Sequence, residues 1–209
     1  MWWCTFRTRP RCVKIQLMSA PDPIEQYLRA AERAMREGVD TAPSALGTAD
    51  EAGRPSVRIV LLRHVDSRGF VFYTNYGSRK ARELTANPRA ALCQDWPTLE
   101  EQIRVEGPVE KIAPSESDAY FAGRPRESQI GAWASVQSQE LASRDILASR
   151  ITEAEARFEG TPVERPPFWG GYRIVPERVE FWYGRAGRLH ERLLYTKSVG
   201  AWKTSWLFP

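Results

Sequence analysis

The sequence predicts a single domain of the α+β class, mainly β, folded as a closed or nearly closed antiparallel barrel with peripheral helices. Its 209 residues suit one domain, and an apolar content of 42% is sufficient for a hydrophobic core. The strand-like runs are short and separated by turn residues, as in closed antiparallel sheets. The first three runs follow one another with turns too short for parallel crossovers. No repeat, low-complexity tract or linker divides the chain.

The first expected elements are a helix and three strands. Asp22 suits the N-cap of the helix, Pro23 its first position and Glu25 the capping-box position, while Gly38 can end it. The short turns between the strands predict an antiparallel meander. These three strands are expected at residues 44–49, 56–65 and 70–74.

The rest of the chain alternates helices with strands. Ser78 should cap a short helix to about residue 86, and Ser115 and Asp118 lie at capping-box spacing in another. Ser143 should cap a longer helix to about residue 158, with Ile146, Leu147, Ile151 and Ala154 on one apolar face. A short helix or turn is expected at 126–133. Further strands are expected at 90–96, 102–112, 171–175, 178–183, 192–196 and 201–207.

Charge and composition exclude several functions. The net charge of +4 comes from four cations within residues 1–21, so the remaining body is neutral and does not predict nucleic-acid binding. Residues 1–20 are interpreted as a basic, disordered N-terminal arm, or as sequence upstream of a start at Met18, rather than as a targeting signal. No apolar run is long enough to span a bilayer. Three unevenly spaced cysteines and two histidines predict no disulfide framework or metal site and favour the cytoplasm.

Cations around the second and third strands indicate anion binding. Arg58 and Arg63 flank four apolar residues and, five apart on a strand, should point to opposite faces and so contact different anions. Arg79 and Lys80 follow the Ser78 cap, where cations oppose the helix dipole and a bound phosphate would compensate them. Taken singly, each pair is better explained as surface charge, on a strand edge for Arg58 and Arg63 and on a solvated helix for Arg79 and Lys80.

Two further clusters contain phosphate-binding or ring-binding side chains. Tyr120, Arg124 and Ser128 recur at a spacing of four and all donate hydrogen bonds to phosphate. His190 lies between Arg188 and Arg192, which should favour its neutral form, suited to recognising a polar ring. No nucleophile triad, Walker loop, dinucleotide fingerprint or carboxylate pair stands out. The polar inventory therefore favours binding of two phosphorylated planar molecules over hydrolysis.

Several separated strings together resemble the pyridoxine/pyridoxamine 5′-phosphate oxidase family. They are RIVLLR, FVFYTNYGSRKARELTANPRAAL, YFAGRPRESQIGAWASVQS, PPFWGGYRIVPERVEFW and RLHER. The resemblance implies a split-barrel, FMN-binding oxidase domain over residues 21–209 and a homodimer with FMN at the interface, each site drawing on both chains. It implies oxidation of pyridoxine and pyridoxamine 5′-phosphates at the C4′ carbon to pyridoxal 5′-phosphate, with O2 as acceptor and H2O2 released.

The resemblance also implies residue roles. The FMN phosphate would be held by Arg58, Arg79, Lys80 and Ser138. The substrate phosphate would be held by Arg63, Tyr120, Arg124 and Ser128, and the catalytic Arg188 and His190 would cover the pyridine ring. The full cofactor set is Arg58, Ile59, Val60, Leu61, Leu62, Arg63, Tyr73, Thr74, Arg79, Lys80, Gln102, Gln137, Ser138, Trp182 and Arg192.

The sequence departs from the family pattern at three places. Arg63 stands where the family usually has Lys, RLHER replaces RLHDR, and residues 1–20 do not align with the family's N-terminal arm. Arg is a planar fork rather than a point charge, so substrate affinity should differ. Two alternatives remain open: a flavin oxidase acting on another ring system, as in phenazine-forming relatives, and a non-catalytic flavin-binding protein.

Overall fold

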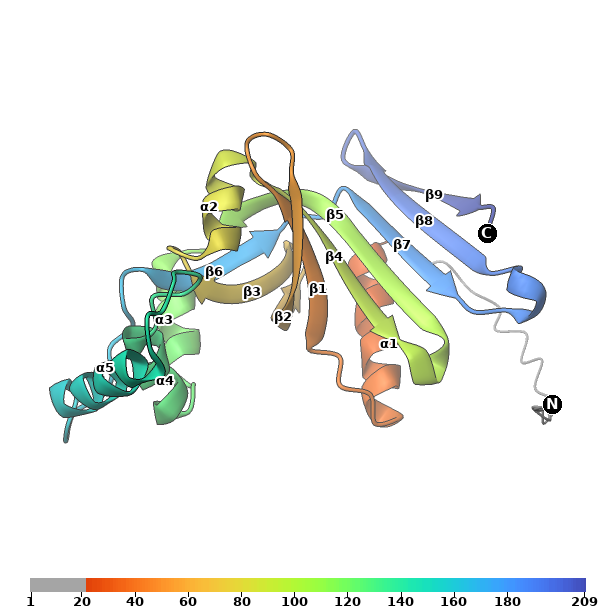
Figure 1. The fold of residues 1–209 in the computed structure, drawn as a ribbon. Coiled ribbons are helices and arrows are strands. Elements are labelled where there is room, and N and C mark those ends of the chain that lie inside the picture. The colour runs from red at the N-terminus through yellow and green to blue at the C-terminus, as the bar shows by residue number, and fades with distance from the viewer. Residues whose placement is uncertain (1–21) are drawn as a thin grey trace, which may run out of the picture.

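The computed structural model describes residues 22–209, so the expectations for residues 1–20 lie outside the described part of the chain. This part contains nine strands, five α-helices and two short 3-10 helices (Figure 1). In chain order they are α1 (Pro23–Arg36), β1 (Pro43–Ala49), β2 (Pro55–Asp66), β3 (Gly69–Asn75), α2 (Arg79–Ala86), β4 (Arg89–Trp96), η1 (Pro97–Leu99), β5 (Glu101–Lys111), α3 (Pro114–Ala122), α4 (Arg126–Ala134), α5 (Arg144–Arg157), β6 (Trp169–Ile174), β7 (Arg178–Tyr183), η2 (Ala186–Arg188), β8 (Glu191–Ser198) and β9 (Ala201–Leu207).

Six strands close an antiparallel barrel in the order β4-β1-β2-β3-β6-β5, with β5 pairing back to β4. The expected meander is confirmed, because β1 pairs with β2 and β2 with β3 in antiparallel register. Inward side chains form one apolar core that includes Leu46, Phe72, Val105 and Ile174, all at most 1% exposed. The predicted fold class, a split antiparallel barrel with peripheral helices, is therefore confirmed.

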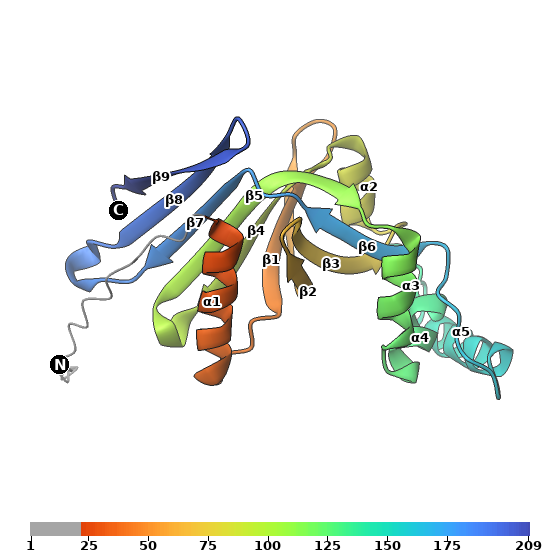
Figure 2. The same cartoon turned by 180° about the vertical axis from the view of Figure 1, so that it is seen from behind.

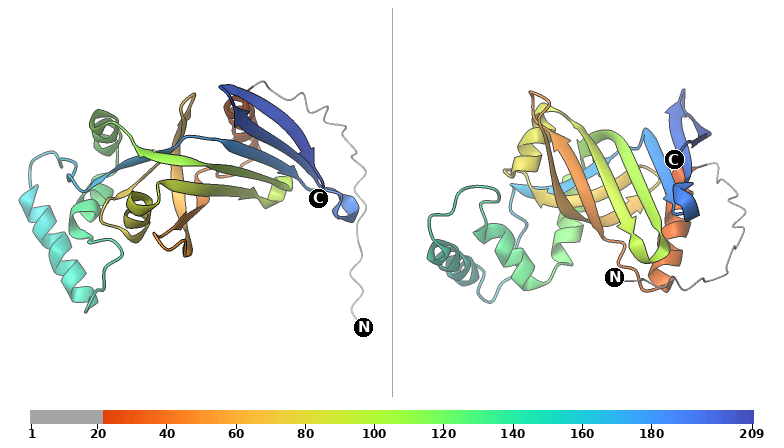
Figure 3. Two further views of the ribbon diagram at one scale, coloured as in Figure 1. Left: turned by 90° about the horizontal axis from the view of Figure 1, so that it is seen from above. Right: turned by 45° about the vertical axis from the view of Figure 1, so that its right-hand side comes forward.

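Strand β5 changes partners along its length, which is where the barrel splits. Its first half, Glu101 to Glu106, pairs with β7, whereas Val109 to Lys111 pair with β6. Strands β7, β8 and β9 extend the sheet away from the barrel as a separate wing (Figures 1 and 3). The switch occurs at Gly107, where an added Cβ would lie 2.0 Å from the Val175 carbonyl oxygen.

The helices divide between two places on the barrel. Helix α1 packs along the barrel between its body and the wing, while α3, α4 and α5 gather at the opposite end (Figure 2). The latter three enclose a smaller apolar cluster that includes Phe121, Ile130, Phe158 and Trp169. None of the helices described is long and apolar enough to cross a membrane.

Local sequence signals explain most helix boundaries. The Asp22 side chain accepts a hydrogen bond from the Ile24 amide at 2.7 Å, and Ser78 caps α2 as expected. The Ser115–Asp118 expectation is wrong: Pro114 takes the first helical position of α3, and Glu116 accepts from the Ala113 amide. Helix α5 begins after Ser143 as expected, without a side-chain cap bond from it.

Candidate active site

Strand β2 places its two arginines on opposite sides, as expected from their spacing. Arg58 shares the inner side with Val60 and Leu62, which are buried, whereas Leu61 and Arg63 face outward. The pairing of β2 with β3 shifts register between Leu62 and His64, so Arg63 lies at an irregularity of the strand. The two cations therefore belong to different parts of the site.

Arg63 contributes to a cavity of about 630 Å³ that is open to solvent. Strands β2, β3 and β6, helices α3 and α4 and the loop after α4 each supply part of its wall. All four residues expected to hold the substrate phosphate, Arg63, Tyr120, Arg124 and Ser128, line it. The remaining lining residues are Leu61, Tyr73, Thr74, Gly123, Pro125, Gln137 and Trp169.

The positive charge in this cavity has no carboxylate to neutralise it. Within residues 22–209, neither Arg63 nor Arg124 forms an ion pair, and the buried Nη1 of Arg124 has no hydrogen-bond partner. Burial lowers the pKa of Arg124. Tyr120 opposes this shift, and the charge of the nearby Arg63 adds to it. A buried, unpaired donor facing a second cation is the electrostatic arrangement of an anion site.

Aromatic rings form one wall of the same cavity. The Tyr73 and Tyr120 rings stack with centroids 3.9 Å apart, and the Trp169 ring lies nearly parallel to both. The guanidinium carbon of Arg124 lies 4.6 Å from the Trp169 ring centroid. Burial raises the pKa of Tyr73 to about 12, so its phenol stays protonated at neutral pH.

Lys80 connects this cavity to the start of helix α2. Its ammonium donates to Thr74 Oγ1 at 3.1 Å and to Gln137 Oε1 at 2.9 Å, and the Thr74 hydroxyl also donates to that amide oxygen. Burial, and then the charge of Arg58, lower the pKa of Lys80 to about 8. Ser138, next along from Gln137, is exposed and has a left-handed backbone, with φ of 70°.

Arg58 and Arg79 share one buried carboxylate, that of Glu83. Arg58 Nη2 lies 3.1 Å from Glu83 Oε2, and Arg79 Nε lies 2.8 Å from Oε1. Burial raises the pKa of Glu83, but hydrogen bonds from Ser56, Thr48 and the two arginines outweigh burial and lower this pKa to about 2. Together with Lys80, the group keeps a net positive charge of about two at neutral pH.

A second group of expected site residues lies on the sheet wing and on the adjoining strand β5. Gln102, Trp182 and Arg192 are direct cross-strand neighbours on β5, β7 and β8, so their side chains share one face. Glu180 is buried and accepts two hydrogen bonds from Arg192, at 2.7 and 3.2 Å. The guanidinium of Arg192 is therefore held in a fixed orientation.

His190 lies next to this row, and Arg188 lies further along the same connection. The His190 and Trp182 ring centroids are 4.5 Å apart, and His190 Nδ1 accepts from the Arg185 amide at 3.2 Å. With Nδ1 as acceptor, the neutral imidazole carries its proton on Nε2. Arg188 is exposed, with φ of 61°.

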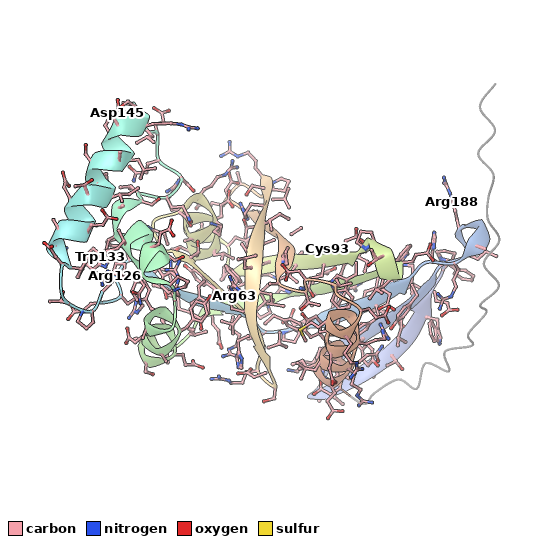
Figure 4. The ribbon with its side chains drawn as sticks, turned by 90° about the horizontal axis from the view of Figure 1, so that it is seen from below. Arg63, Cys93, Arg126, Trp133, Asp145 and Arg188 are labelled. Atoms are coloured by element: carbon pink, nitrogen blue, oxygen red, sulfur yellow. The ribbon has the colours of Figure 1, made fainter. Side chains whose placement is uncertain are left out.

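One chain does not bring the two parts of the site together. Arg188 lies at the far end of the wing, well away from Arg63 on the barrel (Figure 4). The expected site residues thus form a barrel group around Arg63, Arg124 and Lys80 and a wing group around Trp182 and His190.

Sequence reasoning missed three residues that hold the site together: Glu83, Trp169 and Glu180. Glu83 follows Arg79 by four residues on a helix, a spacing that predicts an ion pair and could have identified it. Glu180 and Trp169 contact partners on other elements, far away in the sequence or on a neighbouring strand, for which the sequence carries no local signal.

Comparisons with known structures first define the class of protein. The chain resembles PhzG from Burkholderia lata 383, crystallised with tetrahydrophenazine-1-carboxylic acid, at a TM-score of 0.88 and 35% identity, covering 92% of this chain and 95% of PhzG. A pyridoxamine 5′-phosphate oxidase-related, FMN binding protein from Nostoc punctiforme PCC 73102 shares the fold, with a TM-score of 0.73, 19% identity and coverage of 91% and 100%. The molecule is thus a split-barrel protein of the kind related to pyridoxamine 5′-phosphate oxidase.

Sequence comparisons then define the family. Residues 31–158 match the family model described as pyridoxamine 5′-phosphate oxidase, and residues 169–209 match the pyridoxine 5′-phosphate oxidase C-terminal dimerisation region. The pyridoxine/pyridoxamine 5′-phosphate oxidase of Rubrobacter xylanophilus is 57% identical over 190 residues, 90% of this chain and 88% of that protein. The chain therefore belongs to the pyridoxine/pyridoxamine 5′-phosphate oxidase family. It is an oxidoreductase rather than a non-catalytic flavin-binding protein, and its dimerisation region supports a homodimer.

Proposed function

We propose that this protein is an FMN-dependent oxidase that converts pyridoxine 5′-phosphate and pyridoxamine 5′-phosphate to pyridoxal 5′-phosphate, with O2 as acceptor and H2O2 as product. With the amine substrate, water is also consumed and ammonia is released. The observation that carries the proposal is the cavity between Arg63 and Arg124, which contains positive charge, a buried unpaired donor and an aromatic wall. A phosphate would satisfy the donor, and the adjoining space of about 630 Å³ suits a small ring compound.

Each side chain of the phosphate group has a separate task in this proposal. Arg124 and Arg63 supply charge and N–H donors, and the hydroxyls of Tyr120 and Ser128 complete the set. The planar guanidinium of Arg63 would contact two phosphate oxygens at once, where a lysine would contact them as a point charge. The pyridine ring would then extend from this anchor towards the outer face of β2.

The residues present fit FMN as the cofactor. Arg58, Arg79 and Lys80 around the single carboxylate of Glu83 leave the charge needed by a phosphate dianion, and Ser138 adds a hydroxyl. Gln102, Trp182 and Arg192 present amide, aromatic and cationic groups on one face, suited to a flat heteroaromatic ring. When bound, FMN would supply the two-electron redox chemistry that no side chain here provides.

We further propose a homodimer in which the wing of one copy completes the barrel site of the other. This would bring the second copy's Arg188 and His190 over the substrate ring. The His190 Nε2 proton would be available to a substrate oxygen or nitrogen, because Nδ1 is occupied by the Arg185 amide. Arg188, exposed and without an ion pair among the described residues, would cover the ring and exclude water.

An aerobic peroxide assay on FMN-loaded protein tests the proposal. We expect H2O2 and pyridoxal 5′-phosphate in equal amounts from pyridoxine 5′-phosphate or pyridoxamine 5′-phosphate, and little from the unphosphorylated vitamers. FMN-loaded protein that is inert towards both phosphates would contradict it.

The likeness to PhzG favours one second candidate, oxidation of a phenazine-type ring. The two candidates differ in their need for a phosphate anchor. Under our proposal, Arg124→Ala raises the KM for pyridoxine 5′-phosphate about 100-fold, because a charged hydrogen bond to phosphate contributes about 1.5–3 kcal/mol and a charge is lost with it. An unchanged KM, with turnover of a reduced phenazine carboxylate, would favour the second candidate.

A further inference from the structure

The guanidinium of Arg124 is held differently from those of three other arginines expected to contact ligands. Arg58 and Arg79 contact Glu83, and Arg192 contacts Glu180, so a carboxylate positions each of them. Arg63 and Arg188 lack a carboxylate partner within residues 22–209, but both are exposed. Arg124 also has no carboxylate partner within residues 22–209, although it is half-buried. Something else must fix its orientation, because an arginine side chain otherwise has several freely rotating bonds.

The Trp169 indole occupies the position that a carboxylate would take. The Arg124 guanidinium carbon lies 4.6 Å from the centroid of this ring and 5.5 Å from that of Phe121. A π face attracts a cation without accepting its N–H groups, so the charge and the donors of Arg124 remain available. The Nη1 atom of Arg124 is indeed buried and unpaired.

Trp169 is itself rigidly placed. It begins strand β6, pairs with Asn75 of β3, and its carbonyl accepts from Arg165 Nη1 at 2.6 Å. Trp169 is 7% exposed, and its ring lies nearly parallel to those of Tyr120, with an interplanar angle of 4°, and Tyr73, with an interplanar angle of 10°. The indole thus lies against the Arg124 guanidinium and is parallel to the Tyr120 ring, with centroids 6.2 Å apart.

We infer that Trp169 is a positioning residue for phosphate recognition, which orients Arg124 and Tyr120 while leaving the Arg124 charge unneutralised. The inference rests on the proposed function, and it adds a specific reason why an aromatic residue and not an acid lies behind this arginine. An acid at this place would cancel the charge that attracts phosphate.

The test measures ligand binding rather than turnover. Pyridoxal 5′-phosphate and phosphate-free pyridoxal are titrated calorimetrically into FMN-loaded wild type, Trp169→Leu, Trp169→Phe and Phe158→Leu. Phe158 is also 7% exposed and lies in the same apolar cluster, but makes no contact with Arg124, so it controls for general loosening of the cluster.

The expected pattern is selective for the phosphate. Trp169→Leu should weaken pyridoxal 5′-phosphate binding about tenfold and pyridoxal binding at most about twofold. Trp169→Phe should weaken pyridoxal 5′-phosphate binding about threefold. Phe158→Leu should change the affinity for either ligand by no more than about twofold. Unchanged affinity in Trp169→Leu, or equal losses for both ligands, would overturn the inference. If Trp169→Leu does not fold, Trp169→Phe against Phe158→Leu decides in the same way. Wild type that binds both ligands equally would instead refute the proposed function.

Discussion

At the scale of single residues, the site is organised by how each cation is compensated. Glu83 neutralises part of the charge of Arg58 and Arg79, and Glu180 fixes Arg192, whereas Arg63 and Arg124 have no acid within the described chain. Electrostatic attraction for an incoming anion is therefore concentrated in the cavity between Arg63 and Arg124.

Lys80 makes the proposed cofactor site sensitive to pH. Its pKa of about 8 means that the free protein loses this charge as the pH rises above 8, while the FMN phosphate remains a dianion. A bound phosphate favours the charged form, so FMN affinity is full below pH 8 and falls above it. We expect the Kd, measured by flavin fluorescence, to rise about tenfold between pH 7 and pH 9.

Lys80→Arg provides the matched control, because an arginine stays charged over this range. Its FMN affinity should be flat between pH 7 and pH 9. The same pH dependence in both proteins would show that another group titrates.

From the sequence we predicted residues that the structure brings together around one cavity, but not the residues that support them. Tyr120 and Arg124 were grouped by their spacing of four residues; α3 ends at Ala122, yet both line the same cavity. Trp169 could not be found in this way, because Tyr73 and Tyr120, its stacking partners, lie far from it in the sequence.

At the scale of elements, the strands were the most predictable part of the fold. Short apolar runs bounded by turn residues predicted all nine strands. The apolar residues expected on one face of α5 are mostly uncovered within this chain, since Ile146 and Ile151 are 46% and 36% exposed and only Ala154 of the helix is buried. Helical periodicity shows which residues share a face, but not whether another element covers that face.

The partner switch of β5 depends on Gly107. A methyl group there would lie 2.0 Å from the Val175 carbonyl oxygen, where the strand passes from β7 to β6. We expect Gly107→Ala to lower the free energy of unfolding by about 3 kcal/mol, because backbone must move to admit it. Urea denaturation measures this change.

Gly131 in helix α4 supplies the comparison. A Cβ at this glycine meets no atom within 4 Å. Gly131→Ala should therefore leave stability unchanged or raise it by up to about 1 kcal/mol, as alanine favours a helix. Equal effects at the two glycines would contradict the role given to the β5 crossing.

At the scale of the whole molecule, the barrel and the wing carry separate halves of the proposed site. The barrel group surrounds Arg63 and Arg124, and the wing group surrounds Trp182 and His190, with Arg188 at the end of the wing (Figure 4). Residues 169–209, which include all three wing strands β7, β8 and β9, match the family's dimerisation region. If the wing of each copy packs against the barrel of the other, one symmetric dimer contains two complete sites, each built from both copies.

The most direct test of this account combines two variants that damage different halves. Arg124→Ala and the double variant Arg188→Ala/His190→Ala are co-produced with different affinity tags, and the heterodimer is isolated by sequential purification. One of its two sites would contain both defects and the other neither. We predict that each FMN-loaded homodimer is nearly inactive in the peroxide assay with pyridoxine 5′-phosphate, and that the heterodimer recovers about half of the wild-type activity per dimer. A heterodimer no more active than the two variant homodimers would contradict a site shared between subunits.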